Sequence, residues 1–377
     1  VVDGDDAEAV ARAIAKARLS DKPSLIDCRT TIGKGAPKKA GTEQAHGAPL
    51  GEDEVAGARQ VLGWPYPPFV VPPHIQRAWR QAGARGRPAR EAWERRFAAL
   101  PRDKQEAFRR SSAGKLAPGW QAPLNAFKRE LASDRPKWAT RKASGEALEI
   151  LTATFPEIIG GSADLSESVF TRTKSLEPLV PGDFTGRYVH YGVREHAMAS
   201  IMNGMALHGG FIPYGGTFLV FADYMRGGMR MSALMRQRVI YVLTHDSIGV
   251  GEDGPTHHPV ETLASLRVMP NMLVFRPADA VETFESWLIA LTASDMPSAL
   301  VLTRQAVPAV RLEHESVNLC ARGAYVLHEA DGEEREVTLF ATGSEVHVAV
   351  QARERLQADG IPTAVVSMPC WELFDAQ

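Results

Sequence analysis

Short apolar runs alternate with helical patterns between residues 141 and 304, and this alternation constrains the fold more than any other feature of the chain. Helices placed between such runs usually join strands that lie parallel to one another. We therefore expect an α/β fold with a doubly wound parallel sheet. The expected strands cover residues 157–162, 187–192, 239–243, 271–275 and 299–303.

The first 140 residues fall into two segments of different composition. Residues 1–62 contain a helical pattern at 7–17 and an apolar run at 24–28, which together predict one αβ unit. Residues 63–140 are rich in proline, tryptophan and arginine, and we interpret them as an interdomain connector. The short helices expected within the connector cover residues 89–99 and 104–110.

A central domain at 141–312 is expected to lead into a further α/β segment, residues 313–377. The sequence predicts a strand at 337–341, a helix at 345–358 and a strand at 364–368. The chain starts without methionine and stops soon after the last expected strand, so we expect both ends to be cut relative to a complete protein.

Composition excludes several classes of partner. Forty-three basic and 45 acidic residues leave a net charge of −2, so neither nucleic acid nor a membrane is an expected partner. Glutamates interrupt the arginine-rich stretch at 77–96, which we interpret as a solvated connector rather than a nucleic-acid patch. No apolar run approaches the roughly 20 residues that span a bilayer. The three cysteines are far apart and lack metal-ligand spacing, which favours a reducing cytoplasm.

Residues 244–259, THDSIGVGEDGPTHHP, are the most chemically loaded segment of the sequence. Three histidines, three carboxylates and several glycines follow directly after the buried-strand run at 239–243. Ligands of open α/β sheets bind at the carboxyl ends of such strands. Glycine lets a backbone approach a ligand closely, and imidazoles and carboxylates can move protons. The segment therefore predicts a ligand-facing loop, although a solvated turn rich in histidine is the alternative.

Glu195 lies in YGVREHAM, at a junction between a strand and a helix. It precedes Met198 by three residues, so it is expected on the same buried face of the helix. The helix N-terminus favours a charged carboxylate there, whereas burial favours a protonated one. The alternatives are a pair with Arg194 or a cap of its own helix, and the first is weakened because adjacent helical residues diverge.

Aromatic residues stand three apart at Phe218, Phe221 and Tyr224, where they would share one face of a helix. Such a stripe is usually part of a core. The glycines before it and the neighbouring Asp223 leave a second interpretation open, a platform on which a flat heterocycle stacks.

Further polar groups are expected at strand ends. GGSAD, ending at Asp164, closes the first expected strand of the central domain, and Ser168 follows it; an ordinary helix cap is the alternative. Arg141 and Arg304 stand at element ends, where either could be a surface residue. If both reached the crevice, their planar guanidinium groups would suit a phosphate.

Taken together, eight segments resemble the successive signatures of the transketolase family, in order and along essentially the whole chain. The segments are IDCRTTIGKGAP, AHGAPLG, TRKAS, GGSADLS, HYGVREHAM, GGTFLVFADY, THDSIGVGEDGPTH and LTRQ. The resemblance implies a homodimeric enzyme that transfers a two-carbon ketol unit between sugar phosphates through a thiamine diphosphate ylide. The active site would lie at the subunit interface, and a divalent metal, Mg²⁺ or else Ca²⁺ or Mn²⁺, would be required.

The resemblance also implies a role for each matching residue. Proton transfer from Glu195 to the aminopyrimidine would activate the cofactor. Asp253 would read the hydroxyl next to the ketone, and His245 and His257 would contact the sugar. The implied catalytic residues are Glu195, His257, His245 and His46. The implied cofactor-binding residues are Glu195, Phe221, Phe218, Tyr224, His46 and Asp164. The implied substrate-binding residues are His46, Arg141, Ser168, His245, Asp253, His257 and Arg304.

The sequence departs from the family pattern at the metal site. The family's Gly-Asp-Gly motif and later asparagine have no match, so we expect metal ligands upstream of this chain and none within it. Residues 1–62 would be the end of the diphosphate-binding domain, residues 141–312 the pyrimidine-binding domain, and residues 313–377 the start of the C-terminal domain. The alternatives are a catalytically silent fragment that only dimerises, and a related thiamine enzyme such as dihydroxyacetone synthase or deoxyxylulose phosphate synthase.

Overall fold

A computed structural model describes residues 1–332 and 334–377, which divide into two compact units, Val1–Ala99 and Leu100–Gln377. Each unit is described by itself. Within the described ranges, no helix is long and apolar enough to cross a membrane.

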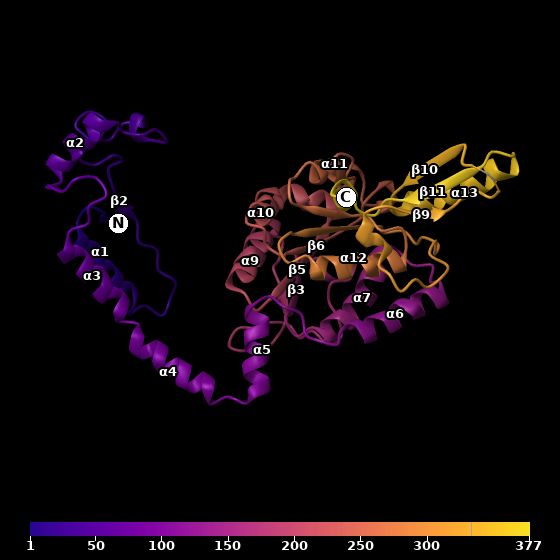
Figure 1. The fold of residues 1–377 in the computed structure, drawn as a ribbon, viewed down its shortest axis with the longest axis horizontal. Coiled ribbons are helices and arrows are strands. Elements are labelled where there is room, and N and C mark those ends of the chain that lie inside the picture. Colours follow the sequence, from indigo (N-terminus) through magenta and orange to yellow (C-terminus); the bar gives the residue numbers. More distant parts are fainter. Residues whose placement is uncertain (333) are drawn as a thin grey trace. The chain divides into compact units, whose positions relative to one another are not determined.

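The first unit is mostly helical, with a small parallel sheet at its start (Figure 1). Asp6 caps the first helix, because its Oδ1 accepts hydrogen bonds from the N–H groups of Glu8 and Ala9. The strand expected at 24–28 is wrong in position: only Cys28 and Arg29 pair, with Val2 and Asp3. Strand pairing, and not apolar character alone, sets these bounds. The elements are β1 (Val2–Asp3), α1 (Ala7–Ala17), β2 (Cys28–Arg29), α2 (Glu52–Val61), α3 (Pro73–Ala84) and α4 (Arg87–Ala98).

The second unit is built on a six-stranded sheet in which every pairing is parallel, in the order β4-β3-β5-β6-β8-β7. The prediction of a doubly wound α/β fold is therefore confirmed. Each of the five expected strands is present within two residues of its expected start. The strands are β3 (Ile158–Ser162), β4 (Tyr188–His190), β5 (Ile212–Phe218), β6 (Ile240–Thr244), β7 (Leu273–Phe275) and β8 (Ser298–Leu302).

Strand β5 was not predicted, and it corrects the helical interpretation of the aromatic stripe. Phe218 ends this strand, Phe221 ends a short 3₁₀ turn, and Tyr224 lies in the first turn of α10. Proline and glycine are uncommon within strands, so IPYGGTF was not recognised as one from the sequence. Packing favours glycine here, because a Cβ on Gly216 would lie 2.5 Å from Cγ2 of Thr171 and one on Gly215 would lie 2.8 Å from the sulfur of Met202.

Helices cover both faces of the large sheet (Figure 1). One face packs against α6, α7 and α12, and the other against α9, α10 and α11. These cores hold the strands rigidly, so their carboxyl ends can present polar side chains. The helices of this unit are α5 (Arg102–Ser112), α6 (Gln121–Asp134), α7 (Thr140–Thr154), α8 (Ser166–Val169), α9 (Glu195–His208), α10 (Ala222–Leu234), α11 (Thr262–Arg267) and α12 (Ala280–Thr292).

The C-terminal segment forms a second, three-stranded sheet in the order β10-β11-β9, drawn in yellow in Figure 1. Strands β10 and β11 pair in parallel as the sequence predicts, whereas the unpredicted β9 pairs antiparallel with β11. The elements are β9 (Tyr325–His328), β10 (Val337–Ala341), α13 (Val346–Ala358), β11 (Thr363–Ser367) and α14 (Trp371–Asp375).

Candidate functional site

An open cavity of about 620 Å³ lies beside the carboxyl ends of the parallel strands of the second unit. Phe218 ends β5, His245 follows β6 and Arg304 follows shortly after β8, so the sheet itself brings these residues together. Five residues that the sequence singled out for a substrate site line this one cavity. The lining residues are Arg141, Ser168, Phe218, His245, Gly251, Glu252, Asp253 and Arg304.

Two arginines face two carboxylates, Glu252 and Asp253, in the lining of the cavity. Nη1 of Arg141 donates a 2.7 Å hydrogen bond to the carbonyl oxygen of Ser168, whereas its buried Nε has no partner within the described part of the chain. Burial, and after it the charge of Arg304, lowers the pKa of Arg141, and Asp253 opposes this shift. An anion between the guanidinium groups would relieve their repulsion, so the arrangement suits a phosphate.

Reciprocal hydrogen bonds fix the two arginines relative to each other. The N–H of Thr303 donates to Oγ1 of Thr140 over 2.7 Å, and the N–H of Thr140 donates to Oγ1 of Thr303 over 3.0 Å. Both threonines are buried, and each directly precedes one of the arginines. The start of α7 and the end of β8 therefore present Arg141 and Arg304 from a rigid base.

Glycine in the loop after β6 allows a close approach to one arginine. Gly251 has a φ of +93°, and a Cβ at this position would lie 2.7 Å from Cζ of Arg304. The loop glycines thus serve the purpose that the sequence suggested, although Gly251 and the cavity-lining Glu252 were not singled out individually.

His245 is buried at the base of the cavity, with 3% of its surface exposed. Its ring stacks on Phe218 with 3.7 Å between centroids, and its Nδ1 lies 2.8 Å from Oγ1 of Thr244. Burial first, and then the charges of Arg141 and Arg304, lowers the pKa of His245 to about 4. The imidazole is therefore neutral near pH 7.

This lowered pKa predicts a loss of stability in acid. The unfolded chain has a histidine pKa of about 6.5, so between pH 6.5 and 4 it binds a proton that native His245 does not. The contribution of His245 to the free energy of unfolding should be constant above about pH 6.5 and should decrease as the pH falls from 6.5 to 4. His245→Asn, which tolerates a positive φ, should flatten this part of the profile measured by urea denaturation. The exposed His314→Asn is the matched control, and an unchanged slope in His245→Asn would contradict the prediction.

Glu195 begins α9 and is 6% exposed. Its Oε1 accepts a 3.2 Å hydrogen bond from Oγ1 of Thr217 on β5. Neither alternative for this residue is found, because Arg194 donates to the carbonyl oxygen of Tyr191 and the helix has no side-chain cap. A buried carboxylate with a single hydroxyl partner can hold or transfer a proton.

Aromatic rings continue the wall from the cavity to the surface of α10. Phe218 and Phe221 are nearly parallel, with 5.8 Å between centroids, and Tyr224 follows at 5.9 Å from Phe221. His257 meets Phe221 edge-on at 5.3 Å. Because Phe221 is only half-buried and Tyr224 is 68% exposed, this stripe is not an ordinary core and can accept a flat ring.

Two further predicted residues are Asp164 and His46, which belong to different units. Asp164 is exposed with a φ of +65° and does not line it, while Ser162 accepts a hydrogen bond from the N–H of Leu165. His46 is exposed in the first unit, after the turn Glu43–Ala45. In residues 1–332 and 334–377, no three histidine, cysteine or acidic residues are arranged to hold a metal ion.

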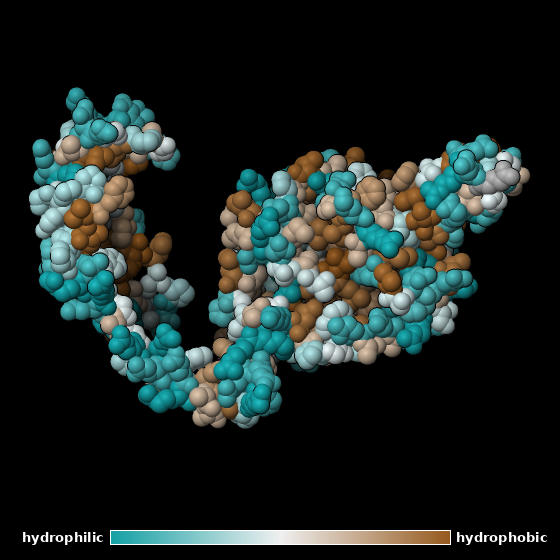
Figure 2. Space-filling model, in the orientation of Figure 1, coloured by the Kyte–Doolittle hydropathy of each residue, from teal (hydrophilic) through white to brown (hydrophobic). Residues whose placement is uncertain are grey.

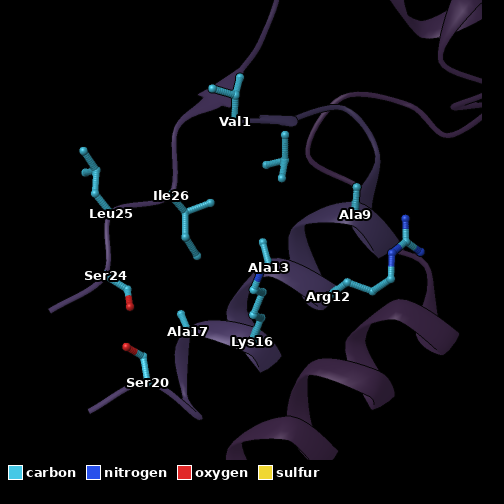
Figure 3. Close-up of a pocket in the computed structure, with 11 residues that line it drawn as sticks. Val1, Ala9, Arg12, Ala13, Lys16, Ala17, Ser20, Ser24, Leu25 and Ile26 are labelled. Carbon is cyan, nitrogen blue, oxygen red and sulfur yellow. The ribbon is translucent and has the colours of Figure 1, made fainter. Parts of the chain in front are cut away.

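A second large cavity, of about 660 Å³, lies in the first unit (Figure 3). Aliphatic side chains such as Ala13, Ala17 and Ile26 surround it, and Arg12 and Lys16 are its charged members. It contains no carboxylate or imidazole, so it offers no acid–base chemistry.

Comparison with known proteins gives three family matches that together cover most of the chain. Residues 1–117 match "Transketolase, thiamine diphosphate binding domain", residues 136–310 match "Transketolase, pyrimidine binding domain", and residues 323–377 match "Transketolase-like TK C-terminal domain". The aligned order agrees with the order of the eight segments identified in the sequence.

Curated relatives are similar over the whole chain. A transketolase of Sinorhizobium medicae is 57% identical over 100% of this chain and 54% of its own length, and transketolase 2 of Escherichia coli is 48% identical over 100% and 56%. The chain therefore spans about half the length of the curated relatives it matches.

Solved structures of transketolases are also similar to this chain. Transketolase from Leishmania mexicana has a TM-score of 0.88 and 42% identity, covering 100% of this chain and 56% of that one. A structure described as a split gene transketolase, inactive beta4 tetramer, has a TM-score of 0.51 and 31% identity, covering 62% of this chain and 72% of that one.

Proposed function

This chain belongs to the transketolase family, and we propose that it supplies the substrate-phosphate site and the pyrimidine site of a ketol-transferring enzyme. One observation carries the proposal: Arg141, His245 and Arg304 converge on a single cavity whose wall continues into the Phe218–Phe221 rings. Its two arginines can bind the phosphate of a sugar phosphate, and the rings beside it have the shape for a heterocycle.

The residues present fit the pyrimidine end of thiamine diphosphate. Glu195 is a buried carboxylate with one hydroxyl partner, and the half-buried Phe221 offers an aromatic face next to Phe218. We propose that Glu195 forms a hydrogen bond with the aminopyrimidine and can transfer a proton through it. Phe218, Phe221 and Tyr224 would enclose the ring, with Asp164 and His46 as further contacts. When bound, thiamine diphosphate supplies a carbanion-stabilising centre for the ketol unit. We propose that Mg²⁺, or Ca²⁺ or Mn²⁺, is held by residues outside this sequence.

The protein residues have separate tasks in the proposed reaction. Arg141, Ser168 and Arg304 would bind the substrate phosphate and so orient the sugar. His245 would donate a hydrogen bond to the sugar as a neutral imidazole, because its pKa is lowered. We further propose that His257 and Asp253 contact hydroxyls near the reacting carbon and that His46 completes the set.

The three domain boundaries follow from the same proposal. Residues 1–62 would belong to the diphosphate-binding domain, 63–140 to the connector, 141–312 to the pyrimidine-binding domain and 313–377 to the C-terminal domain. The family matches begin or end at 117, 136, 310 and 323, which supports the later boundaries more closely than the first. The proposed location of the protein is the cytoplasm.

The function is tested with the chain fused to the parts of the Sinorhizobium medicae relative with which it does not align. This chimera should transfer a ketol unit from xylulose 5-phosphate to ribose 5-phosphate. Activity only with pyruvate or formaldehyde would instead indicate a related thiamine enzyme.

Calorimetry on the 41.1 kDa chain alone, with its intact mass verified, measures thiamine diphosphate and Mg²⁺ binding. Tight binding by the chain alone would contradict the proposal that the metal ligands lie elsewhere.

We propose a homodimer because large apolar side chains are exposed along α9 and α10. Ile201, Leu207, Met231 and Leu234 are each more than two-fifths exposed. Figure 2 shows brown, hydrophobic atoms along this edge of the larger unit. Exposed apolar side chains gathered on one edge are typical of a protein interface.

The proposed interface predicts that Ile201→Asp combined with Leu234→Asp weakens self-association by roughly 10- to 100-fold. Sedimentation equilibrium should then give the 41.1 kDa chain mass where wild type gives twice that mass. Val326→Asp, at a comparably exposed valine on β9, should leave association unchanged. A wild-type chain that stays monomeric at the highest concentration would contradict the proposal.

A further inference from the structure

A buried ion pair anchors the loop that follows His245. The next residue is Asp246, whose side chain is 1% exposed. Its Oδ2 accepts a 2.9 Å hydrogen bond from Nε of Arg276, which directly follows β7 and has a side chain 7% exposed. Strand β8 lies between β6 and β7, so this ion pair reaches across the end of the strand that leads to Arg304.

The C-terminal segment holds the same arginine from its other side. Nη1 of Arg276 donates to the carbonyl oxygen of Thr342 over 2.9 Å and to the carboxylate of Glu345. Nη2 donates to Oγ of Ser344 over 3.4 Å. These residues form the turn between β10 and α13 and belong to the C-terminal family match. The forked guanidinium thus connects two domains of the family.

Close packing makes this connection specific. Gly343 has a φ of +59°, and a Cβ there would lie 2.7 Å from Cγ of Arg276. The N–H of Gly343 also donates to the carbonyl oxygen of Arg276 over 2.9 Å. Burial lowers the pKa of Arg276, but the charge of Asp246 and the hydrogen bond to Glu345 outweigh it and raise the pKa overall. The arginine therefore stays charged in the pair.

We propose that Arg276 is a positioning residue for His245 and acts through Asp246. His245 has a φ of +62°, a conformation that a non-glycine residue keeps only when its surroundings hold it. The anchored Asp246 fixes the peptide bond between His245 and Asp246. With this bond fixed, the imidazole of His245 stacks on Phe218 at the base of the cavity. The C-terminal turn at 342–345 thus supports the phosphate cavity without lining it. This inference rests on the proposed function, because that function assigns His245 to the cavity.

The test uses the 377-residue chain, with inorganic phosphate as the probe. Arg276→Met and Asp246→Asn should each weaken phosphate binding roughly tenfold in calorimetry. By NMR, the pKa of His245 should rise from about 4 toward the usual histidine value of about 6.5, because the released ring meets solvent. Lys128→Met is the matched control. It breaks another buried ion pair, the 2.5 Å contact with Glu285, and should lower stability while leaving both readouts unchanged.

The outcomes separate positioning from simple stabilisation. Asp246→Asn keeps the shape of the side chain, so it carries the test if Arg276→Met does not fold. If the variants lose stability but keep wild-type phosphate affinity and the wild-type pKa of His245, Arg276 is only structural and the inference is wrong. If the wild-type chain binds no phosphate, the proposed phosphate site is wrong instead. In that case the pKa of His245 in Asp246→Asn still decides whether the ion pair positions the imidazole.

Discussion

Glu195→Gln should lower kcat of the chimera for ketol transfer by roughly 10²- to 10⁴-fold, the usual contribution of a general acid or base. The amide fills the same space and can still accept the hydrogen bond from Thr217, so the fold should persist. What it cannot do is accept and return a proton. The measurement is steady-state ketol transfer at saturating thiamine diphosphate, together with thermal unfolding of the same preparation.

The matched control for this substitution is Glu157→Gln. Glu157 is also a buried glutamate, but it precedes β3 at the amino edge of the sheet and pairs with Arg110. Its variant should lose stability and keep turnover. Equal turnover in Glu195→Gln and wild type would refute the assigned role, whatever the effect on unfolding.

Arg304→Ala should raise KM for phosphorylated sugars by roughly 10- to 100-fold, because a hydrogen bond to a charged group contributes about 1.5–3 kcal/mol. Arg141 would remain, held by Ser168, so binding should weaken and not vanish. For an unphosphorylated ketose, the same variant should change KM much less. The split between substrates is the informative quantity, because it isolates the phosphate contact from general damage to the site.

Arg129→Ala removes an exposed arginine from α6 and is the control for a change in net charge. It should leave both KM values at their wild-type levels. If Arg304→Ala weakens phosphorylated and unphosphorylated substrates equally, the arginine does not bind phosphate, and the cavity would need another assignment.

Continuous apolar runs made the central strands predictable. Val242 and Leu300, for example, lie in runs that are buried on both faces of a parallel sheet, so their sequence carries the signal directly. Strand β5 carries no such signal, because Pro213 and the glycines interrupt it. Those small residues are set by neighbours such as Met202 and Val169, which are distant in the sequence.

The candidate site was predictable where one rule sufficed. Carboxyl ends of neighbouring parallel strands share an edge, and this rule placed the loop with His245 and the segment ending at Asp164 at one edge before any geometry was known. The family resemblance added Ser168 and Arg304 to the same site. The same rule could not find Arg276, which the sequence shows only as one arginine after an apolar run. Its partner Asp246 is 30 residues away and its turn at 342–345 is 66 to 69 residues away, so only the fold reveals their contact.

The hydrogen bonds between Thr140 and Thr303 join residues 163 positions apart. Closing so long a loop is entropically costly, so we expect this contact to form after the local helices during folding. The cavity base is complete only when this closure is made. A phosphate ligand that recognises both arginines therefore binds the finished sheet and no earlier species. Such a ligand should slow the unfolding of the native protein and leave the folding rate almost unchanged.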